Sequence, residues 1–310
     1  MPKVSIVIPA YNVGPWIEET LKSVQQQTFK DFECIVVDDK STDKTCAVVN
    51  CFIGKDRRFK LILRDHNEGQ GACRNVGIWL AQGEYIAFLD SDDLWHPTFL
   101  ERMLQLIESK GAWLAYSHFA MFHDGTSIRK PLAWDNLLRT KNIWWDMLLM
   151  TEFHLCSCLG SSELVRKSGG FDSRMRTGQD RDFLLRLLAM ICEKHPEKVC
   201  GTEEELFFYR QRESSTIYTR QRQAIAIEWN FMPRYLDHPG VPAAVRRRGY
   251  SFLAFKMGVI SLNLKDYAGA IRWFIKSVCY DPLNINLFWL PLRKIWYKIK
   301  SEENIEFLDK

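Results

Sequence analysis

The fold is decided by one stretch of the sequence, Tyr85-Ile86-Ala87-Phe88-Leu89-Asp90-Ser91-Asp92-Asp93. A short apolar run ends abruptly in three carboxylates, and Gly83 marks a turn before it. Such a run is typical of a strand that is buried on both faces of a sheet. In open α/β sheets, ligands bind outside the carboxyl ends of the strands. We therefore expect Asp90, Asp92 and Asp93 to lie at a binding site.

Two interpretations of these carboxylates are open when the stretch is taken alone. Clustered carboxylates repel one another and are usually compensated by a cation, and hard oxygen ligands favour Mg²⁺ or Mn²⁺. Alternatively, Asp-Ser-Asp-Asp caps the helix expected over residues 97–109, because Asp and Ser are favoured N-caps. The rest of the chain has to decide between a metal site and a helix cap.

The first part of the chain alternates between apolar runs and helical patterns. Strands are expected over residues 4–9, 32–37 and 59–63. Helices are expected over 17–28 and 72–81. A further helix is expected to begin after Ser41-Thr42-Asp43, with Thr42 or Asp43 as its N-cap. This alternation predicts a doubly wound α/β fold with a mostly parallel sheet. Right-handed crossovers would gather the polar groups that follow the strands at one edge, namely Asn12, Asp38, Asp39, Arg74 and Asp90 to Asp93. Neither a G-x-G-x-x-G after the first strand nor a Walker lysine loop is present, which disfavours dinucleotide-dependent reduction and P-loop hydrolysis.

Composition and charge narrow the class of protein. The 310 residues are 46% hydrophobic and 26% charged, which is ordinary for a soluble globular chain. A net charge of +4 is too small to indicate nucleic-acid binding, so no nucleic-acid partner is expected. The nine cysteines show none of the C-x₂-C spacings of zinc or redox sites. With no apolar stretch long enough to span a bilayer and no visible secretory signal, we expect a cytoplasmic protein with reduced thiols.

The middle of the chain is less regular. Trp113, Tyr116, Phe119 and Phe122 suggest a strand or short elements, and Trp134, Trp144 and Trp145 lie in a helix-like or loop region. After the turn Gly169-Gly170-Phe171-Asp172, a helix begins near Gln179, and 199–209 is a further expected strand. Asp180 and Asp182 either cap that helix or supply a general base. The arginines of Arg210-Gln211-Arg212 either form a solvated face or pair with phosphate.

Several motifs occur together in order, and the sequence resembles a family 2 glycosyltransferase with the GT-A fold. The matching segments are Val4-Ser5-Ile6-Val7-Ile8-Pro9-Ala10-Tyr11-Asn12, Val36-Val37-Asp38-Asp39-Lys40-Ser41-Thr42-Asp43-Lys44-Thr45, Asn67-x-Gly69-x-Gly71-Ala72-x-Arg74-Asn75-x-Gly77, Phe88-Leu89-Asp90-Ser91-Asp92-Asp93, Gly169-Gly170-Phe171-Asp172 and Gln179-Asp180-x-Asp182. The resemblance covers about the first two-thirds of the chain. The motifs are specific to the family as a set, and any one of them alone would be weak evidence.

The resemblance implies a nucleotide-sugar donor, usually UDP-linked, and inversion at the anomeric carbon. It implies donor contacts at Pro9, Ala10, Tyr11, Asn12, Asp38, Asp39, Arg74, Asp90, Ser91 and Asp92. It implies Mn²⁺ or Mg²⁺ held by Asp92, the favoured direct ligand, and by Asp90. Asp180 matches the family's catalytic base. Secondary acceptor or donor contacts are expected from Gln179, Asp182, Arg210 and Arg212.

Two departures from the family pattern affect the expected reaction. Gln179 stands where the family usually has Glu, so acceptor contacts are expected to differ. Gln211-Arg212-Glu213-Ser214 does not supply the Gln-x-x-Arg-Trp motif of the processive polymerases. We therefore expect transfer of one sugar to a hydroxyl of a surface polysaccharide, lipid-linked glycan or glycoprotein. The competing hypotheses are an inactive sugar-nucleotide-binding or scaffolding protein and, with less support, a nucleotidyltransferase.

Beyond about residue 221 the pattern is helical. We expect a catalytic domain over 1–220 and a C-terminal helical region over 221–310, in which 252–282 resembles a single tetratricopeptide unit. A basic aromatic tail follows, with Phe288-Trp289-Leu290 and then Arg293, Lys294, Trp296, Tyr297, Lys298 and Lys300. This tail either contacts the inner face of an anionic membrane or packs on the domain with a solvated basic face.

Overall fold

A computed structural model describes residues 1–123, 154–175, 177–211, 229 and 231–282. The chain forms two compact units, Met1–Met147 with Thr151–Ser215 and Leu148–Met150 with Thr216–Lys310. Each unit is described by itself. Some of the predictions lie outside the described residues, namely those for Trp134, Trp144, Trp145, Arg212 and the tail 288–300.

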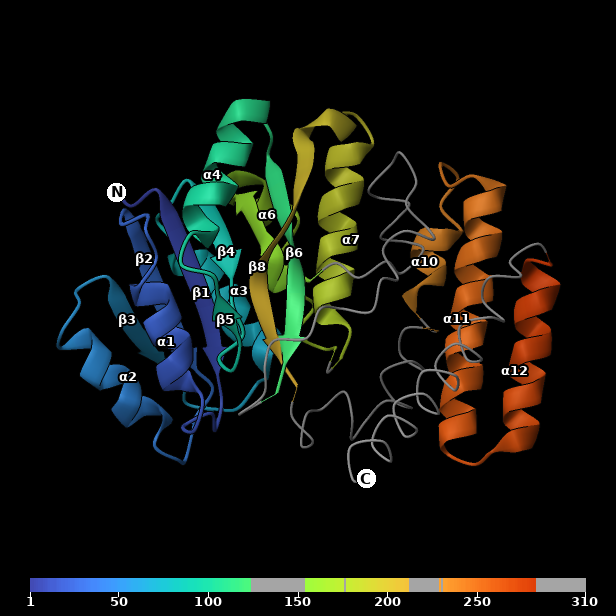
Figure 1. Cartoon of the computed structure of the whole chain (residues 1–310), viewed down its shortest axis with the longest axis horizontal. Coiled ribbons are helices and arrows are strands. Elements are labelled where there is room, and N and C mark those ends of the chain that lie inside the picture. Colours follow the sequence, from blue (N-terminus) through green and yellow to red (C-terminus); the bar gives the residue numbers. More distant parts are fainter. Residues whose placement is uncertain (124–153, 176, 212–228, 230, 283–310) are drawn as a thin grey trace, which may run out of the picture. The chain divides into compact units, whose positions relative to one another are not determined.

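The larger unit is built on one mixed sheet (Figure 1). Its strands are β1 (Val4–Ala10), β2 (Phe32–Asp38), β3 (Phe59–Leu63), β4 (Tyr85–Phe88), β5 (Leu94–Trp95), β6 (Leu114–Phe122), β7 (Cys158–Ser161) and β8 (Val199–Arg210). Their order across the sheet is β3-β2-β1-β4-β7-β6-β8-β5. Every residue of β1 and β2 is buried, as expected for central strands covered on both faces.

Strand direction decides where the strand ends meet. β1 pairs in parallel with β2 and β4, β2 pairs in parallel with β3, and β6 pairs in parallel with β8. The antiparallel strand β7 lies between β4 and β6, so β4, β6 and β8 run the same way. Consequently the carboxyl ends of β1, β2, β4, β6 and β8 share one edge, and the polar residues that follow them gather there.

Helices cover both faces of the sheet (Figure 1). They are α1 (Ile17–Gln25), α2 (Thr45–Ile53), α3 (Gln70–Leu80), α4 (Phe99–Lys110), α6 (Ser162–Lys167) and α7 (Gln179–Cys192). Buried side chains of α1, α2 and α4 join Val4, Ile6 and Ile8 of β1 in one hydrophobic core. Val7 points to the other face, where α3 approaches it so closely that a Cβ at Gly77 would overlap it. The α/β class predicted from the alternating pattern is therefore confirmed.

Element boundaries differ from the predictions in small ways. The expected strands match within one residue, but the helix expected over 17–28 ends at Gln25 and the one opened by Ser41-Thr42-Asp43 begins only at Thr45. The predicted N-cap at Thr42 or Asp43 is wrong, since the cap position is Lys44. Asp43 still accepts hydrogen bonds from the backbone N–H and hydroxyl of Thr45, so it stabilises the helix start from one position further out.

The second unit contains α10 (Pro233–Leu236), α11 (Ala243–Asn263) and α12 (Tyr267–Tyr280). α11 and α12 pack together, and Ser277 Oγ donates to the carbonyl of Ser251 at 2.8 Å across the buried seam. These helices agree with the helical pattern predicted beyond about residue 221, whereas the likeness to a tetratricopeptide unit stays a prediction. None of the helices among the described residues is both long and apolar enough to cross a membrane.

Candidate active site

The acidic turn, residues Asp90 to Asp93, connects β4 to β5 at the carboxyl edge of the sheet. The backbone N–H of Asp93 donates to the carbonyl of Asp90 at 3.1 Å, which closes the turn. The Asp93 side chain is buried, and its Oδ1 accepts the backbone N–H of Arg210 at 2.8 Å. The last residue of β8 therefore holds this turn in place.

Arg210 supports the acidic turn in a second way. Its side chain is buried, its Nε donates to the carbonyl of Asp92 at 2.7 Å, and its Nη2 pairs with Glu19 of α1 at 2.5 Å. The guanidinium also lies 4.6 Å from the Phe122 ring centre. The expectation of a solvated face is therefore wrong for Arg210. The charge is instead used to join α1, β6 and β8 to the turn.

Arg74 of α3 lies between two carboxylates and is 1% exposed. Its Nη1 contacts Asp180 at 2.5 Å, and its Nη2 contacts Asp90 at 2.6 Å. The guanidinium also lies 5.2 Å from the ring centre of Phe171. A single buried cation thus links the proposed base to the proposed metal ligand, although 106 residues separate Arg74 from Asp180 in sequence.

The environment of Asp180 suits a base. Surrounding protein atoms desolvate the carboxylate, although 45% of the side chain is exposed, and this desolvation raises the pKa of Asp180 above its usual 3.8. The charge of Arg74 acts in the opposite direction, and the charge of Asp90 adds to the rise. A carboxylate with a raised pKa and an open side is a better proton acceptor than an ordinary surface aspartate.

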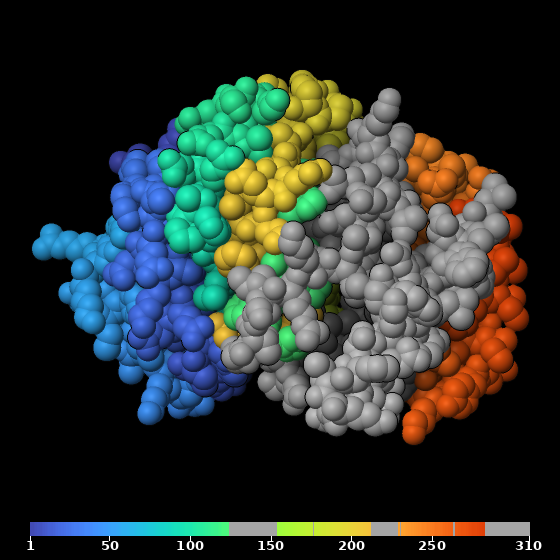
Figure 2. All heavy atoms as spheres, viewed as in Figure 1, coloured from blue at the N-terminus to red at the C-terminus, as the bar shows by residue number. Residues whose placement is uncertain are grey.

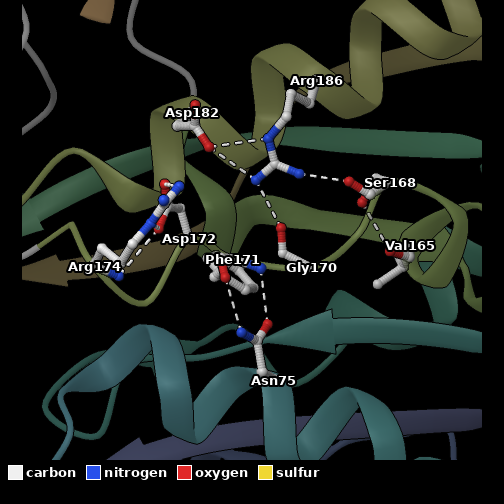
Figure 3. A network of polar contacts seen from close by, with 9 residues as sticks. All are labelled: Asn75, Val165, Ser168, Gly170, Phe171, Asp172, Arg174, Asp182 and Arg186. Atoms are coloured by element: carbon white, nitrogen blue, oxygen red, sulfur yellow. Dashed lines mark hydrogen bonds and ion pairs between the residues drawn. The ribbon is translucent and has the colours of Figure 1, made fainter.

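The turn preceding α7 is locked to two helices (Figure 3). Arg186 donates to the carbonyls of Ser168 and Gly170 at 2.5 and 2.6 Å, and its Nη2 pairs with Asp182 at 2.8 Å. Asn75, which follows Arg74 on α3, donates to the carbonyl of Phe171 at 2.8 Å and accepts its N–H at 2.7 Å. This network fixes α7, and with it Asp180, relative to α3.

Of the secondary contacts expected here, Gln179 and Asp182 lie on the first turn of α7. Both are buried, at 8% and 4% exposure. The Asp182 carboxylate accepts two hydrogen bonds from Arg186, so it stabilises the helix and the adjoining turn. Its contact with an acceptor stays a prediction.

The residues predicted to contact the nucleotide of the donor lie at and after the carboxyl ends of β1 and β2. Ala10 and Asp38 are register partners, and the N–H of Asp39 donates to the carbonyl of Ala10 at 2.8 Å. Tyr11 is 48% exposed, so its ring is available to stack on a base. Asn12, at φ 50°, accepts the Thr42 N–H at 2.8 Å through its side chain. Pro9 is buried within β1.

Asp38 and Asp39 are both buried and both bonded to backbone. Asp39 accepts the N–H groups of Glu68 and Gly69 at 2.9 and 2.7 Å, which shapes the glycine-rich loop leading into α3. Asp38 accepts the N–H of Ser41 at 2.9 Å through Oδ2. Its Oδ1 is buried without a hydrogen-bond partner among the described residues, so it remains a candidate donor-binding atom. A carboxylate oxygen can accept more than one hydrogen bond, so Asp39 also retains capacity for a ligand.

The acidic turn fits a divalent cation. Asp90, Asp93 and Cys156 each offer a ligand atom, and these atoms lie within 4.8 Å of one another. Oδ2 of Asp93 is buried and finds no hydrogen-bond partner within the described part of the chain. Burial, with the charges of Asp92 and Asp90 adding, raises the pKa of Asp93 well above its usual range. Carboxylate oxygens are the ligands that Mg²⁺ and Mn²⁺ prefer.

Cys156 is a poor member of such a site. Burial raises the pKa of its thiol well above the usual 9.0, and the neighbouring Asp90 and Asp93 charges raise it further. A protonated thiol does not suit a hard cation. Asp93 is therefore a further candidate ligand in the acidic turn, beside the Asp92 and Asp90 that were predicted to hold the metal. Ser91, also in this turn, is buried.

Two further residues near the site, Glu19 and His154, were not predicted, because no sequence motif marks them. Glu19 lies in an ordinary amphipathic helix, and its partner Arg210 is 191 residues away in sequence. His154 lies between aromatic rings, 4.5 Å from the centre of Phe119 and 5.1 Å from that of Tyr209. Burial lowers the pKa of His154 to about 4, so the imidazole is neutral near pH 7.

Comparisons with known proteins identify the family of the chain. Residues 5–168 match the model of the family Glycosyl transferase family 2. The succinoglycan biosynthesis protein ExoO of Rhizobium meliloti is 30% identical over 94% of this chain and 85% of its own length. A UDP-Glc:alpha-D-GlcNAc-diphosphoundecaprenol beta-1,3-glucosyltransferase of Escherichia coli, WfaP, is 38% identical over 40% of this chain and 49% of its own. The putative teichuronic acid biosynthesis glycosyltransferase TuaG of Bacillus subtilis is 36% identical over 44% of this chain and 58% of its own.

The match spans about half the length of several curated relatives, WfaP and TuaG among them.

Solved structures share the fold. TarS 1–349 of S. aureus in complex with UDP-GlcNAc has a TM-score of 0.65 at 18% identity, covering 89% of this chain and 79% of that chain. The mannosyltransferase PcManGT from Pyrobaculum calidifontis, in complex with GDP-Man and Mn²⁺, has a TM-score of 0.62 at 18% identity, covering 96% and 88%. On the family match and the long alignment with ExoO, the chain belongs to glycosyl transferase family 2.

Proposed function

We propose that this protein is an inverting, metal-dependent glycosyltransferase that moves one sugar from a nucleotide-sugar donor, UDP-linked, to a hydroxyl acceptor. The acceptor belongs to a polysaccharide, a lipid-linked glycan or a glycoprotein. The observation that carries the proposal is the position of Arg74, whose two Nη atoms hold Asp180 and Asp90. This contact brings the proposed base and the acidic turn to one place.

The proposed chemistry assigns one task to each part of the site. Asp180 takes the proton of the acceptor hydroxyl while the oxygen of that hydroxyl attacks the anomeric carbon from the face opposite the diphosphate. The bond to the diphosphate breaks as the new C–O bond forms, so the configuration inverts. A Mg²⁺ or Mn²⁺ held by Asp92, Asp90 and Asp93 would offset the charge of the departing nucleoside diphosphate.

We further propose that residues 1–220 form the catalytic domain and 221–310 a separate helical region. The donor would contact Pro9, Ala10, Tyr11, Asn12, Asp38, Asp39 and Ser91. The protein would work in the cytoplasm, with peripheral contact of the tail 288–300 at the inner face of the membrane. Support for a glycan or lipid-linked acceptor comes from the names of the relatives TuaG and WfaP.

A donor panel tests the proposal. UDP-, GDP- and dTDP-sugars would be incubated with the full chain and Mn²⁺ or Mg²⁺, and release of nucleoside diphosphate would be followed. We expect metal-dependent release from one UDP-sugar, with loss of release in Asp92→Ala while the circular dichroism spectrum is unchanged. Donor binding by calorimetry without turnover would instead support the inactive binding protein, and release of pyrophosphate would indicate a nucleotidyltransferase.

A further inference from the structure

The helical unit carries an exposed apolar stripe along α12. Tyr267, Ile271 and Ile275 are 62%, 59% and 59% exposed. Side chains four residues apart lie on the same face of a helix, so the three form one continuous row. Nearby in sequence, Leu262 in the last turn of α11 and Leu264 at its C-cap are 39% and 51% exposed. Among the described residues, half of the exposed large hydrophobic side chains lie in this short segment. Figure 2 shows atoms of α12, in red, at the surface of this unit.

The same unit is strongly basic. Arg272 and Lys276 directly follow Ile271 and Ile275 and are exposed, so cationic groups border the stripe. Over 229 and 231–282 the basic residues are Arg234, Arg246, Arg247, Arg248, Lys256, Lys265, Arg272 and Lys276, and the acidic ones are Asp237, Asp266 and Asp281. Eight cations against three anions leave this part with a formal charge of +5.

The acidic residues do little to offset the basic ones beside the stripe. Asp266 caps α12 by accepting the N–H of Gly269 at 2.9 Å, and Asp281 lies 3.7 Å from Arg248. The stripe is therefore bordered by cations with no exposed carboxylate of its own in α12. An apolar row beside a basic edge is the pattern of a helix that lies in a membrane interface.

We propose that the stripe Tyr267, Ile271 and Ile275 docks on an anionic phospholipid surface, with Arg272 and Lys276 at the headgroups. Apolar side chains gain by leaving water, and each cation is attracted by the negative surface potential. A second copy of the chain is a poorer occupant, because residues 229 and 231–282 of two copies, each with a formal charge of +5, repel each other. If the proposed function holds, this docking would bring the enzyme to lipid-linked acceptors.

Vesicle sedimentation with the full chain tests the docking. We expect binding to phosphatidylglycerol vesicles at about 50 mM salt, weaker binding to phosphatidylcholine vesicles, and loss of the difference at about 500 mM salt. The double variant Ile271→Ser, Ile275→Ser is expected to bind about tenfold less tightly. Arg272→Glu with Lys276→Glu should remove the preference for the anionic lipid.

Leu63→Ser with Trp79→Ser is the matched control, because these side chains are 65% and 81% exposed in the catalytic unit. It should bind like the wild type. The proposal is overturned if the wild type ignores anionic vesicles, or if the Ile271 and Ile275 double variant binds as tightly as the wild type. A wild-type dimer in light scattering that this variant dissociates would also overturn it. Binding needs no turnover, so a silent donor panel would reject the proposed function without affecting this test.

Discussion

Arg74 shows how one buried side chain can hold two carboxylates of the candidate site in place. Its Nη atoms lie 2.5 Å from Asp180 and 2.6 Å from Asp90, and its own exposure is 1%. A buried guanidinium is retained only when its charge is paired, and two carboxylates supply that pairing. In return, the pair of contacts holds the proposed base at a set position relative to the acidic turn. Positioning of this kind is a large part of catalysis in transfer reactions.

Replacing the base tests the role of Asp180. Asp180→Asn keeps the shape and removes the proton acceptor, so kcat is expected to fall by about 10²–10⁴ with little change in donor KM. Release of nucleoside diphosphate in the presence of acceptor is the measurement. The matched control is Asp172→Asn, whose carboxylate pairs with Arg174 nearby. Equal losses in both variants would show that Asp180 has no special role.

The pH dependence of the rate reports on Arg74. Desolvation raises the pKa of Asp180 above 3.8, and the Arg74 charge lowers it. The base works when deprotonated, so the rate should rise with pH through a pKa above the ordinary value. Arg74→Gln removes the lowering influence, so the acidic limb of kcat should move to higher pH. A limb that stays in place, or moves to lower pH, would contradict the assignment of Asp180 as the base.

At the scale of elements, the positions of single strands could be predicted from the sequence, whereas pairings between strands far apart in the chain could not. β1 and β2 are contiguous apolar runs covered on both faces, so their positions and the carboxylates after them could be predicted from pattern alone. The antiparallel β7 is only Cys158–Ser161, and it lies between β4 and β6 through pairings that no short pattern encodes. The bonds from Arg210 to Asp92 and Asp93 depend on that long-range order.

The turn before α7 offers a test of the network that locks α3 to α7. Gly170 has a φ of +68°, and a Cβ there would lie 2.5 Å from Oδ1 of Asn75, whereas one at Gly169, at φ +82°, would meet nothing within 4 Å. Both Gly→Ala changes incur backbone strain of about 1 kcal/mol. Gly170→Ala should lower the free energy of unfolding by about 1–3 kcal/mol more, because it also displaces Asn75. Urea unfolding measures the difference, and equal losses would show that the Asn75 contact adds no stability.

At the scale of the whole molecule, the chain combines a sheet with the candidate site at its edge and a helical unit that carries none of the proposed catalytic residues. Every described residue of the candidate site belongs to the unit that contains β1 to β8. The helical unit has its own core, in which Phe255 is 4% exposed and lies 5.5 Å from the ring centre of Phe274. If the proposed division near residue 220 is right, a change in the stability of the helical unit should leave catalysis unaffected.

A core variant of the helical unit tests that division. Phe255→Ala leaves a cavity and is expected to destabilise the helical unit by about 3–5 kcal/mol. Because the proposed catalytic residues lie elsewhere, release of nucleoside diphosphate at 25 °C should stay within about twofold of the wild type. Tyr267→Ala is the control, since this aromatic side chain is 62% exposed and its loss should leave the melting profile unchanged. Thermal circular dichroism and the donor assay would be run on the same samples. If turnover falls in step with helix stability, the helical unit is part of the catalytic machinery and the division near residue 220 is wrong.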